Sequence, residues 1–426
     1  MKSFTLLALP LSLAGTLLSA FAGPWPNWRG PAHDNIAPDR SAPTSWDKSK
    51  NVRWRVELPD AGNSSPIVWG NRVLITQATE KDGRRQVMCF DRRTGDLLWA
   101  AGPTYNEKET KHETNTHCAA SPVTDGKRVI ASFASAGVFC FDMDGKELWR
   151  ADLGPQNHIW GQGSSPVLHG ELCIVYHGPG TPSIVYALDK NTGRKVWETA
   201  IPEVQPKERF DGFAGKSGGA MGSFATPLPV QAGSRTEIIL PAGNKVLALD
   251  PASGKELWRG EDMNPLVYSS ASFGEGHVVA MGGFFGSAMA LKPGGNGDVS
   301  KDRLWYEQRA KKHRIGSPII KGGHIYIANT DGTAECLDLA TGKPVWMERL
   351  PATGSDGETW GSMVLIGDKL YVVNHSGDTF ILRAAPKFEI LAINSVGERS
   401  NSTLAVSDGE LFLRTHAALY CISDTK

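Results

Sequence analysis

The sequence predicts an all-β propeller of eight four-stranded antiparallel blades. Three observations predict it: a repeated strand-turn-strand segment, a recurring strand opening, and chain ends that complement each other. The 426 residues include 47 Gly and 26 Pro, as expected for a fold with many turns, and 13 Trp and 15 Phe, which can fill a large core. Because 45 basic residues balance 45 acidic ones, the net charge gives no basis for binding nucleic acid.

Residues 1–22 have the features of a cleavable secretory signal peptide. Lys2 supplies the positive start, residues 4–18 are apolar, and Ala20-Phe21-Ala22 is a small-residue cleavage signal. The apolar stretch contains Pro10 and is short for a membrane span. No Cys follows the cleavage signal, so a lipid anchor is not indicated. We predict cleavage after Ala22 and a periplasmic or secreted protein without a membrane span.

One segment type recurs through the rest of the chain: hydrophobic, small, hydrophobic, Asp, a Gly turn, and then a strand with Trp. The Asp side chain can accept hydrogen bonds from the backbone ahead of it, and the Gly can supply the positive φ that closes a hairpin. Each copy therefore predicts strand, turn, strand. The copies are residues 88–100, 139–150, 186–198, 247–259 and 335–347, with a degenerate copy at 289–307.

The Trp residues of these copies recur at the period of a propeller blade. Successive spacings are 45, 50, 48, 61, 47 and 41 residues, which suits one four-stranded sheet per repeat. We interpret these indoles as packing between neighbouring blades. They are Trp54, Trp99, Trp149, Trp197, Trp258, Trp305 and Trp346.

A second landmark, a small residue usually followed by Pro, opens an apolar strand in each unit. It occurs at 65–66, 121–122, 165–166, 226–227, 271–272, 317–318, 362–363 and 402–403. A further strand precedes the Asp turn, for example at 72–78, 128–134, 172–178, 277–283, 324–330 and 369–375. Eight openings predict eight blades; seven is the alternative if the weak units around 271–307 or 362–393 are misassigned.

The two ends of the chain complement each other. The last unit stops at 419–423 without its Trp strand, whereas residues 51–58 form a Trp strand that precedes the first complete unit. Pairing the two would complete the eighth blade and leave no open sheet edge. The predicted organisation is a signal peptide (1–22), an N-terminal segment (23–50) and a propeller (51–426), which we expect to be a monomer.

The six cysteines do not predict disulfides, although the chain is predicted to be exported. Four of them occupy one repeat position, where other copies carry Ala, so this position is a small buried slot. Cys173 lies within a predicted strand, and Cys118, in the loop 112–122, is expected to be exposed. No C-x-x-C or H-E-x-x-H motif occurs, so no metal site is predicted. The repeat-position cysteines are Cys89, Cys140, Cys336 and Cys421, aligned with Ala187, Ala248 and Ala290.

The repeats resemble those of the PQQ-like β-propeller repeat family, which includes quinoprotein alcohol dehydrogenases, the outer-membrane assembly factor BamB and many exported bacterial proteins. The segment WPNWRGPAHDNIAPD (25–39) is similar to the start of that last group, and the resemblance covers residues 25–424. For the dehydrogenases it implies pyrroloquinoline quinone (PQQ) and Ca²⁺ at the propeller axis, an Asp base and often a disulfide of adjacent Cys. This chain has no adjacent Cys pair and no C-x-x-C-H haem motif.

The loops that precede the strand openings are expected to meet at one mouth of the central channel. Arg side chains there can bind a carboxylate or quinone oxygen, and Glu358 with Asn401 is the nearest analogue of a Ca²⁺-binding pair. No catalytic residue is assigned, and the Gly-rich run 211–227 is expected to be a flexible connector, a lid over the mouth. The cofactor-binding candidates are Trp160, Arg314, Trp360, Arg399 and Asn401, and further ligand candidates are His117, His158, Tyr268, His313 and Glu358.

The leading functional hypothesis is an exported binding or scaffold protein of the cell envelope, with a protein partner or a small polar ligand and no redox cofactor. The alternative is a periplasmic PQQ-dependent oxidoreductase that acts on an alcohol or a sugar, with Ca²⁺ as its metal. A hydrolase or lyase acting on polysaccharide ranks third, because only loop His and Glu residues favour it and no paired carboxylates can be located.

Overall fold

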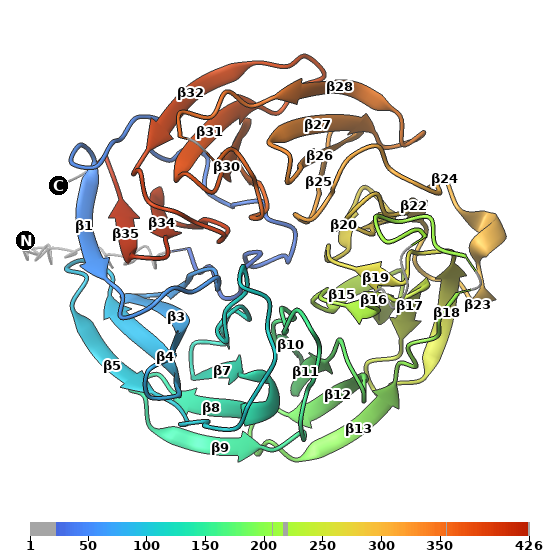
Figure 1. The fold of residues 1–426 in the computed structure, drawn as a ribbon, viewed down its shortest axis with the longest axis horizontal. Coiled ribbons are helices and arrows are strands. Elements are labelled where there is room, and N and C mark those ends of the chain that lie inside the picture. The colour runs from blue at the N-terminus through green and yellow to red at the C-terminus, as the bar shows by residue number, and fades with distance from the viewer. Residues whose placement is uncertain (1–22, 207, 216–219, 355, 425–426) are drawn as a thin grey trace, which may run out of the picture.

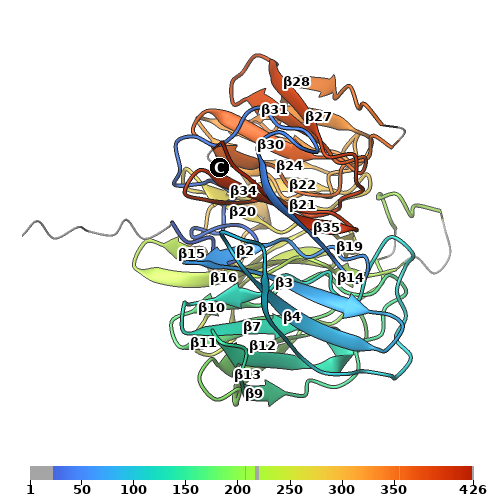
Figure 2. The ribbon, with the colours of Figure 1, turned by 90° about the vertical axis from the view of Figure 1, so that its left-hand side faces the viewer.

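The computed structural model describes residues 23–426, except 207, 216–219, 355 and 425–426. The described residues form eight sheets arranged as blades around a central axis (Figure 1), so the prediction of eight rather than seven blades is confirmed. Figure 2 shows the resulting disc from its edge. The predicted signal peptide lies outside the described residues. Within the described part of the chain, no helix is long and apolar enough to cross a membrane.

Each of the first four blades is an antiparallel meander that runs from the axis outward. In the fourth blade a fifth strand, β23 (Gly297–Asp298), adds in parallel to the outer edge. Blades 1 to 4 consist of β2 (Ile67–Trp69), β3 (Arg72–Thr79), β4 (Arg84–Asp91) and β5 (Leu97–Ala101); β6 (Val123–Thr124), β7 (Arg128–Ser132), β8 (Val138–Asp142) and β9 (Glu147–Ala151); β10 (Val167–His169), β11 (Leu172–His177), β12 (Ile184–Asp189) and β13 (Lys195–Ala200); and β15 (Leu228–Ala232), β16 (Arg235–Ala242), β17 (Lys245–Leu249) and β18 (Glu256–Glu261).

Blades 5 to 8 repeat the pattern. They consist of β20 (Ser272–Gly274), β21 (His277–Met281), β22 (Ala288–Leu291) and β24 (Trp305–Glu307); β25 (Ile319–Lys321), β26 (His324–Ala328), β27 (Thr333–Asp338) and β28 (Pro344–Arg349); β29 (Val364–Ile366), β30 (Lys369–Val373), β31 (Asp378–Arg383) and β32 (Ile390–Ser395); and β33 (Ala405–Ser407), β34 (Glu410–Arg414), β35 (Ala418–Ile422) and β1 (Val52–Glu57). The remaining elements are the parallel pair β14 (Gly222–Ser223) and β19 (Leu266–Val267) and the short 3₁₀ helices η1 (Ala134–Ala136) and η2 (Ser300–Asp302).

The N-terminal strand closes the ring, as predicted. β1 pairs antiparallel with β35, and Trp54 lies opposite Cys421. Figure 1 shows the two strands side by side near the chain ends. Because the first and last parts of the propeller share one sheet, the ring has no free edge at the point where the chain begins and ends.

The repeated Trp residues join neighbouring blades, which confirms their interpretation. The indole of Trp149 in blade 2 donates to the carbonyl of Lys190 in the Asp turn of blade 3, at 2.9 Å. Gly193 of the same turn lies against that indole with φ of 72°, and a Cβ added there would lie 2.5 Å from the ring. The turn glycine is therefore required both by its backbone conformation and by the neighbouring Trp. Corresponding indole-to-carbonyl bonds are made by Trp54, Trp99, Trp197, Trp305 and Trp346.

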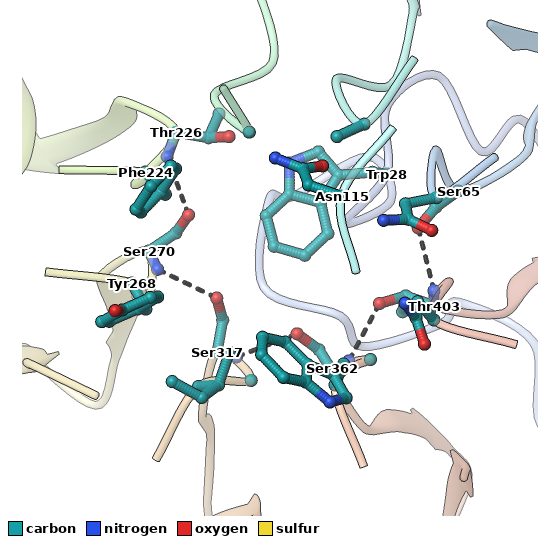
Figure 3. A pocket seen from close by; sticks show the side chains of 18 of the residues that line it. Trp28, Ser65, Asn115, Phe224, Thr226, Tyr268, Ser270, Ser317, Ser362 and Thr403 are labelled. Atoms are coloured by element: carbon teal, nitrogen blue, oxygen red, sulfur yellow. Dashed lines mark hydrogen bonds between the residues drawn. The ribbon is translucent and has the colours of Figure 1, made fainter. Parts of the chain in front are cut away.

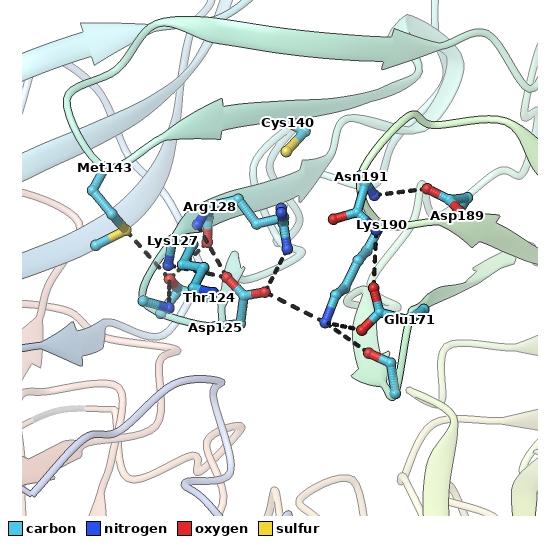
Figure 4. Close-up of polar contacts among 12 residues, drawn as sticks. Thr124, Asp125, Lys127, Arg128, Cys140, Met143, Glu171, Asp189, Lys190 and Asn191 are labelled. Carbon is cyan, nitrogen blue, oxygen red and sulfur yellow. Dashed lines mark hydrogen bonds and ion pairs between the residues drawn. The ribbon is translucent and has the colours of Figure 1, made fainter.

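Ion pairs reinforce the seam between blades 2 and 3 (Figure 4). Lys190 lies 3.1 Å from the carboxylate of Glu171 and 3.6 Å from that of Asp125, which also pairs with Arg128 at 2.7 Å. Asp125 and Arg128 belong to blade 2, whereas Glu171 and Lys190 belong to blade 3. The contacts therefore cross the seam, although partly exposed pairs of this kind stabilise a fold only modestly.

The repeat-position cysteines fill the predicted small slot. Cys89, Cys140 and Cys336 are buried with free thiols, and each lies directly opposite the Trp of its own blade. A small side chain is needed at this point because the indole covers it. The expectation for Cys118 was wrong: the residue is buried, and its sulfur lies 3.8 Å from the guanidinium of Arg414, because the loop 112–122 folds inward against the last blade.

A closed ring of hydrogen bonds surrounds the axis, with one member from each blade. The backbone N–H of each member donates to the side-chain hydroxyl oxygen of the member in the next blade, at distances from 2.8 to 3.1 Å. We call these eight residues the hydroxyl ring, part of which is seen in Figure 3. They are Ser65, Ser121, Ser165, Thr226, Ser270, Ser317, Ser362 and Thr403.

The hydroxyl ring explains the predicted strand openings. Every member lies two residues before the innermost strand of its blade, and a following Pro holds the member in an extended conformation in five blades. In blade 5 the predicted opening at 271–272 was one residue late, because Ser270 is the member that accepts the bond. In blade 8 the member is Thr403, the second residue of the predicted pair.

Removing one hydroxyl from the ring should destabilise the whole propeller. In Ser317→Ala the buried N–H of Ser270 loses its acceptor, which we expect to cost about 1–3 kcal/mol of unfolding free energy. Ser317→Thr is the matched control, because Thr already serves in two other blades. Chemical denaturation of the three proteins measures the difference, and equal stability of Ser317→Ala and wild type would contradict a structural role for the ring.

Candidate functional site

The central channel contains a cavity of about 460 Å³, which is lined by two stacked layers of residues. The lower layer is the hydroxyl ring. The upper layer comes from the position two residues before each hydroxyl and is called the mouth ring here. All eight of its positions line the cavity: Asn63, Ala119, Gly163, Phe224, Tyr268, Ile315, Trp360 and Asn401. One position of the repeat therefore determines much of the chemistry of the cavity.

The N-terminal segment closes the opposite end of the channel. Trp28 lines the cavity, and Figure 3 shows its indole within the circle of hydroxyl residues. The neighbouring Arg29 is buried and donates to the carbonyl of Ala271, the hydroxyl of Ser272 and the carbonyl of Pro318, so it joins blades 5 and 6. In Figure 2 the segment lies on one face of the disc, and the long connector after blade 3 projects from the other face. The cavity is thus open on the connector side.

Aromatic rings form a continuous wall on one side of the cavity. Phe224 and Tyr268 are stacked with centroids 5.4 Å apart, Tyr268 meets Phe284 at 5.2 Å, and Phe284 meets Trp360 at 6.3 Å. Trp160 extends the wall beside Tyr268 at 6.0 Å. These rings come from blades 4, 5 and 7 and from the loops between blades, and each is partly accessible. The wall can hold a flat or apolar face of a ligand.

The other side of the cavity is polar and carries little charge. Asn63, Thr114, Asn115, Gln162 and Asn401 contribute amides and a hydroxyl. Asn115 is committed to structure, because its side-chain amide donates to the carbonyls of Trp160 and Gln162 at 2.7 and 2.9 Å. Among the described residues that line the cavity there is no Lys or Arg, and the single carboxylate is that of Glu358.

Five of the ten residues proposed from the sequence line this cavity. Trp160, Tyr268 and Trp360 lie in the aromatic wall, and Asn401 lies on the polar side. Glu358 accepts a hydrogen bond from the indole of Trp360 at 3.0 Å, which fixes both side chains at the rim. The structure therefore brings these five side chains together from loops that are far apart in the sequence.

The two arginines of the prediction do not line the cavity. Arg314 is buried and pairs with Glu335 at 2.8 Å and with Glu307 at 2.6 Å. Burial lowers its pKa, but the two carboxylates outweigh this effect and raise the pKa above its usual range. Arg399 is exposed and lies 3.5 Å from the imidazole of His375. Neither guanidinium faces the space where a ligand carboxylate would lie.

The three histidines of the prediction also lie outside the cavity lining. His117 pairs with the buried carboxylate of Glu109 at 3.2 Å. His158 packs edge-on against Phe224, and burial lowers its pKa to about 4, so it is uncharged at neutral pH. His313 packs against Phe284 at 4.7 Å, and burial lowers its pKa as well. His158 and His313 thus support the aromatic wall from behind.

One group of described residues has the composition of a metal site. Ligand atoms of Asp356, Glu358 and His375 lie within 4.8 Å of one another. The imidazole of His375 is 3.0 Å from the carboxylate of Asp356 and stacks on the indole of Trp360. Arg399 already places a positive charge at this point, so the group is a balanced cluster of ionisable side chains at the rim of the cavity.

The described lining does not fit PQQ. This cofactor is an ortho-quinone with three carboxylate groups, so its site must supply positive charge. The described lining offers no Lys or Arg, its one imidazole is the exposed side chain of His112, and its one carboxylate would repel the cofactor. Glu358 is bonded to Trp360, and the amide of Asn401 is directed to the carbonyl of Thr114 at 3.5 Å. We therefore derive no chemistry through a quinone.

Sequence analysis missed several residues that line the cavity. Trp28 lies in a segment that was treated as separate from the propeller, and Phe284 lies in a Gly-rich loop with no repeat signal. The hydroxyl ring was found only as a strand opening. Counting two residues back from each predicted opening would have identified six of the eight mouth-ring residues, Phe224 among them, because the openings predicted for blades 5 and 8 are displaced by one residue. No signal in the repeat indicates that the N-terminal segment folds across the channel.

Three comparisons place the chain among known proteins. A family model described as "Outer membrane protein assembly factor BamB" matches residues 39–177 and 138–426. The outer membrane protein assembly factor BamB of Burkholderia pseudomallei (strain K96243) is 23% identical over 368 residues, covering 78% of this chain and 87% of that protein. The crystal structure of BamB from Moraxella catarrhalis has a TM-score of 0.59 at 14% identity and covers 88% of this chain and 98% of that one.

A solved structure of a europium-containing methanol dehydrogenase is also similar, with a TM-score of 0.63 at 11% identity, and covers 94% of this chain and 98% of that one. At such identities the structural likeness shows the propeller fold alone.

The ion-pair cluster of Glu109 predicts a pH-dependent stability. Burial raises the pKa of this carboxyl, but the hydrogen bond from His117, the charge of Arg85 and the bonds from Ser135 outweigh it and hold the pKa at about 2. A depressed folded-state pKa stabilises the protein above the unfolded-state value, and this contribution is lost as the pH falls towards 2. Glu109→Gln should be less stable than wild type by roughly 2–3 kcal/mol at pH 6.

Urea denaturation at several pH values measures this difference. We expect the gap between Glu109→Gln and wild type to narrow steadily between pH 5 and pH 2. Glu147→Gln, which alters an exposed pair with Arg150, is the control and should leave stability nearly unchanged. A gap for Glu109→Gln that stays constant across this pH range would contradict the assignment.

Proposed function

Since the chain belongs to the family of the outer membrane protein assembly factor BamB, we propose that it is a binding protein of the cell envelope that holds a protein partner during the assembly of outer membrane proteins. The observation that carries this proposal is the ring itself, which is closed by its own N-terminal strand and plugged on one face, and which has no Lys or Arg in its described cavity lining. Such a disc offers a rigid surface for binding rather than a centre for quinone chemistry.

The N-terminal sequence supports a location in the cell envelope. A cleavable signal peptide ending at Ala22 would deliver the protein to the periplasm, where a family member acting on outer membrane proteins must work. The mature chain would then consist of the N-terminal segment (23–50) and the propeller (51–426), acting as one unit because Trp28 and Arg29 are built into the channel.

The surface that best suits a protein partner is a groove of about 600 Å³ between blades 4 and 5, on the open face of the disc. Val204, Phe210 and Tyr306 line it and are 62%, 45% and 37% exposed, which is unusual for apolar side chains that lie together. Its described charged residues are three carboxylates against one ammonium group: Glu208, Glu261 and Asp262, with Lys245. The groove therefore suits an apolar segment of the partner that is flanked by basic residues.

Placing a carboxylate in the groove should release the partner. We expect Val204→Asp to capture at least about tenfold less of the partner than wild type from a detergent-solubilised envelope extract, with recovery quantified by mass spectrometry. The side chain of Val204 is largely exposed, so the melting temperature should not change. Ile393→Asp, at an exposed apolar position on β32, is the matched control and should bind normally. Equal recovery by both variants would exclude the groove, and recovery of no envelope protein by wild type would remove the proposal.

The cofactor-free interpretation has its own test. Titration of the purified mature protein with PQQ, with and without Ca²⁺, should leave the fluorescence of its 13 Trp residues unchanged apart from linear absorption by the quinone. We expect this result because the described cavity lining has no Lys or Arg to balance three carboxylates. Saturable one-to-one quenching at micromolar PQQ would instead support a quinoprotein oxidoreductase and would justify a screen of alcohols and sugars.

A further inference from the structure

We propose that the central cavity binds the end of a neutral oligosaccharide. This site is distinct from the groove between blades 4 and 5, so the inference goes beyond partner binding and does not depend on it. Four properties of the cavity lead to it: an aromatic wall, unpartnered polar atoms of both kinds, the lack of Lys and Arg in its described lining, and a closed floor.

The mouth ring divides the cavity into two unlike halves. Blades 4 to 7 contribute Phe224, Tyr268, Ile315 and Trp360, whereas blades 8 and 1 contribute Asn401 and Asn63, and blades 2 and 3 contribute only Ala119 and Gly163. A sugar ring has the matching division, because its C–H groups form an apolar face while its hydroxyls project from the edge. The face would lie on the aromatic wall and the hydroxyls would reach the amides.

Three residues that line the cavity carry side-chain polar atoms without a hydrogen-bond partner among the described residues. The side-chain nitrogen of Gln162, the phenol oxygen of Tyr268 and the side-chain oxygen of Asn401 are buried and have no hydrogen-bond partner among the described residues. Gln162 is only 6% exposed, so its uncommitted donor is costly unless a ligand meets it. The set comprises a donor, an acceptor and a phenol that can act as either, which suits groups that both donate and accept, as hydroxyls do.

The hydroxyl ring adds donors below this level. Each member accepts one backbone N–H and lines the cavity, and a hydroxyl that accepts one bond still has its own O–H proton to donate. The charge of the cavity restricts the ligand further. With Glu358 as the only carboxylate in the described lining and no Lys or Arg there, a phosphorylated or acidic sugar would be repelled by Glu358 and would find no guanidinium or ammonium partner.

The closed end of the channel determines which part of an oligosaccharide can enter the cavity. Trp28 closes the channel below the hydroxyl ring, and Arg29 fixes it through three bonds to blades 5 and 6. A polysaccharide therefore cannot thread through the disc, and only its terminal units can occupy the cavity. The volume of about 460 Å³ lies within the range of roughly 300–1,000 Å³ found for small-ligand sites.

Calorimetric titration with cellotriose, maltotriose and N,N′,N″-triacetylchitotriose tests the proposal on the mature wild-type protein. We expect saturable binding of at least one of them, and at least about tenfold weaker binding by Trp360→Ala. Gln162→Ala is the second variant: it removes a side-chain nitrogen without a described protein partner, so it should weaken binding while the melting temperature stays constant. Leu148→Ala, on an exposed outer-strand position, is the control.

Three results would overturn the proposal: no binding of any neutral sugar, binding that the two cavity variants leave unchanged, or binding of tetramethylammonium or glucose 6-phosphate alone. Binding of tetramethylammonium alone would indicate an aromatic site for cations, and binding of glucose 6-phosphate alone would indicate a site for anions. The outcome is separable from that of partner binding, because Val204→Asp should bind the sugar normally and Gln162→Ala should capture the protein partner normally.

Discussion

The hydrogen bonds of the hydroxyl ring are the constraint on which the rest of the structure depends. Each bond runs from the backbone of one blade to the side chain of the next, so the ring closes only when all eight blades place a hydroxyl at the same distance from the axis. That requirement fixes the start of every innermost strand, and with it the direction from which each connecting loop arrives. The loops must therefore converge above the ring, and the residue two positions before each hydroxyl faces the channel. Closure of the fold and construction of the cavity are consequences of one interaction.

Two further sets of contacts hold the blades together: one lies at the periphery of the disc, and the other on the face that the N-terminal segment covers. At the periphery, each indole of the Trp repeat spans a seam and bonds to the turn of the next blade, as Trp149 does with Lys190, while the turn glycine leaves room for the ring. Trp258 departs from this pattern: its indole donates to the buried carboxylate of Glu237 in its own blade, because the degenerate repeat that follows lacks the Asp turn. There the strand β23 pairs with β18 and adds backbone hydrogen bonds at the outer edge of blade 4. From below, the N-terminal segment crosses the axis and joins blades that are distant in the sequence.

The fold could be predicted because each repeat contains the residues that join it to its neighbour. Trp contacts the turn Gly of the next blade across the seam and the small residue opposite it in its own blade, so their spacing carries tertiary information. The site was only partly predictable. Its loops could be located from the strand openings, but charge pairing within the loops could not. Arg314 is held by Glu335, whose position inside the apolar strand 333–338 was the available signal of a buried ion pair. His117 is held by Glu109, which lies in a connector without repeat character. Loop residues such as Arg314 and His117 that pair with a carboxylate elsewhere in the protein therefore do not line the cavity.

The same arrangement separates stability from recognition. The hydroxyl ring uses backbone N–H groups and short hydroxyl side chains, whereas the mouth ring above it uses only the side chain two residues earlier. A change from Trp to Asn at a mouth position alters the wall of the cavity and leaves the closing hydrogen bond intact. In this chain blades 4 to 7 carry apolar or aromatic side chains at that position, while blades 8 and 1 carry amides, so a nearly symmetric frame encloses an asymmetric cavity. This independence gives a physical reason why one propeller frame can serve both binding proteins and dehydrogenases: the function lies in side chains that the closure of the ring does not constrain.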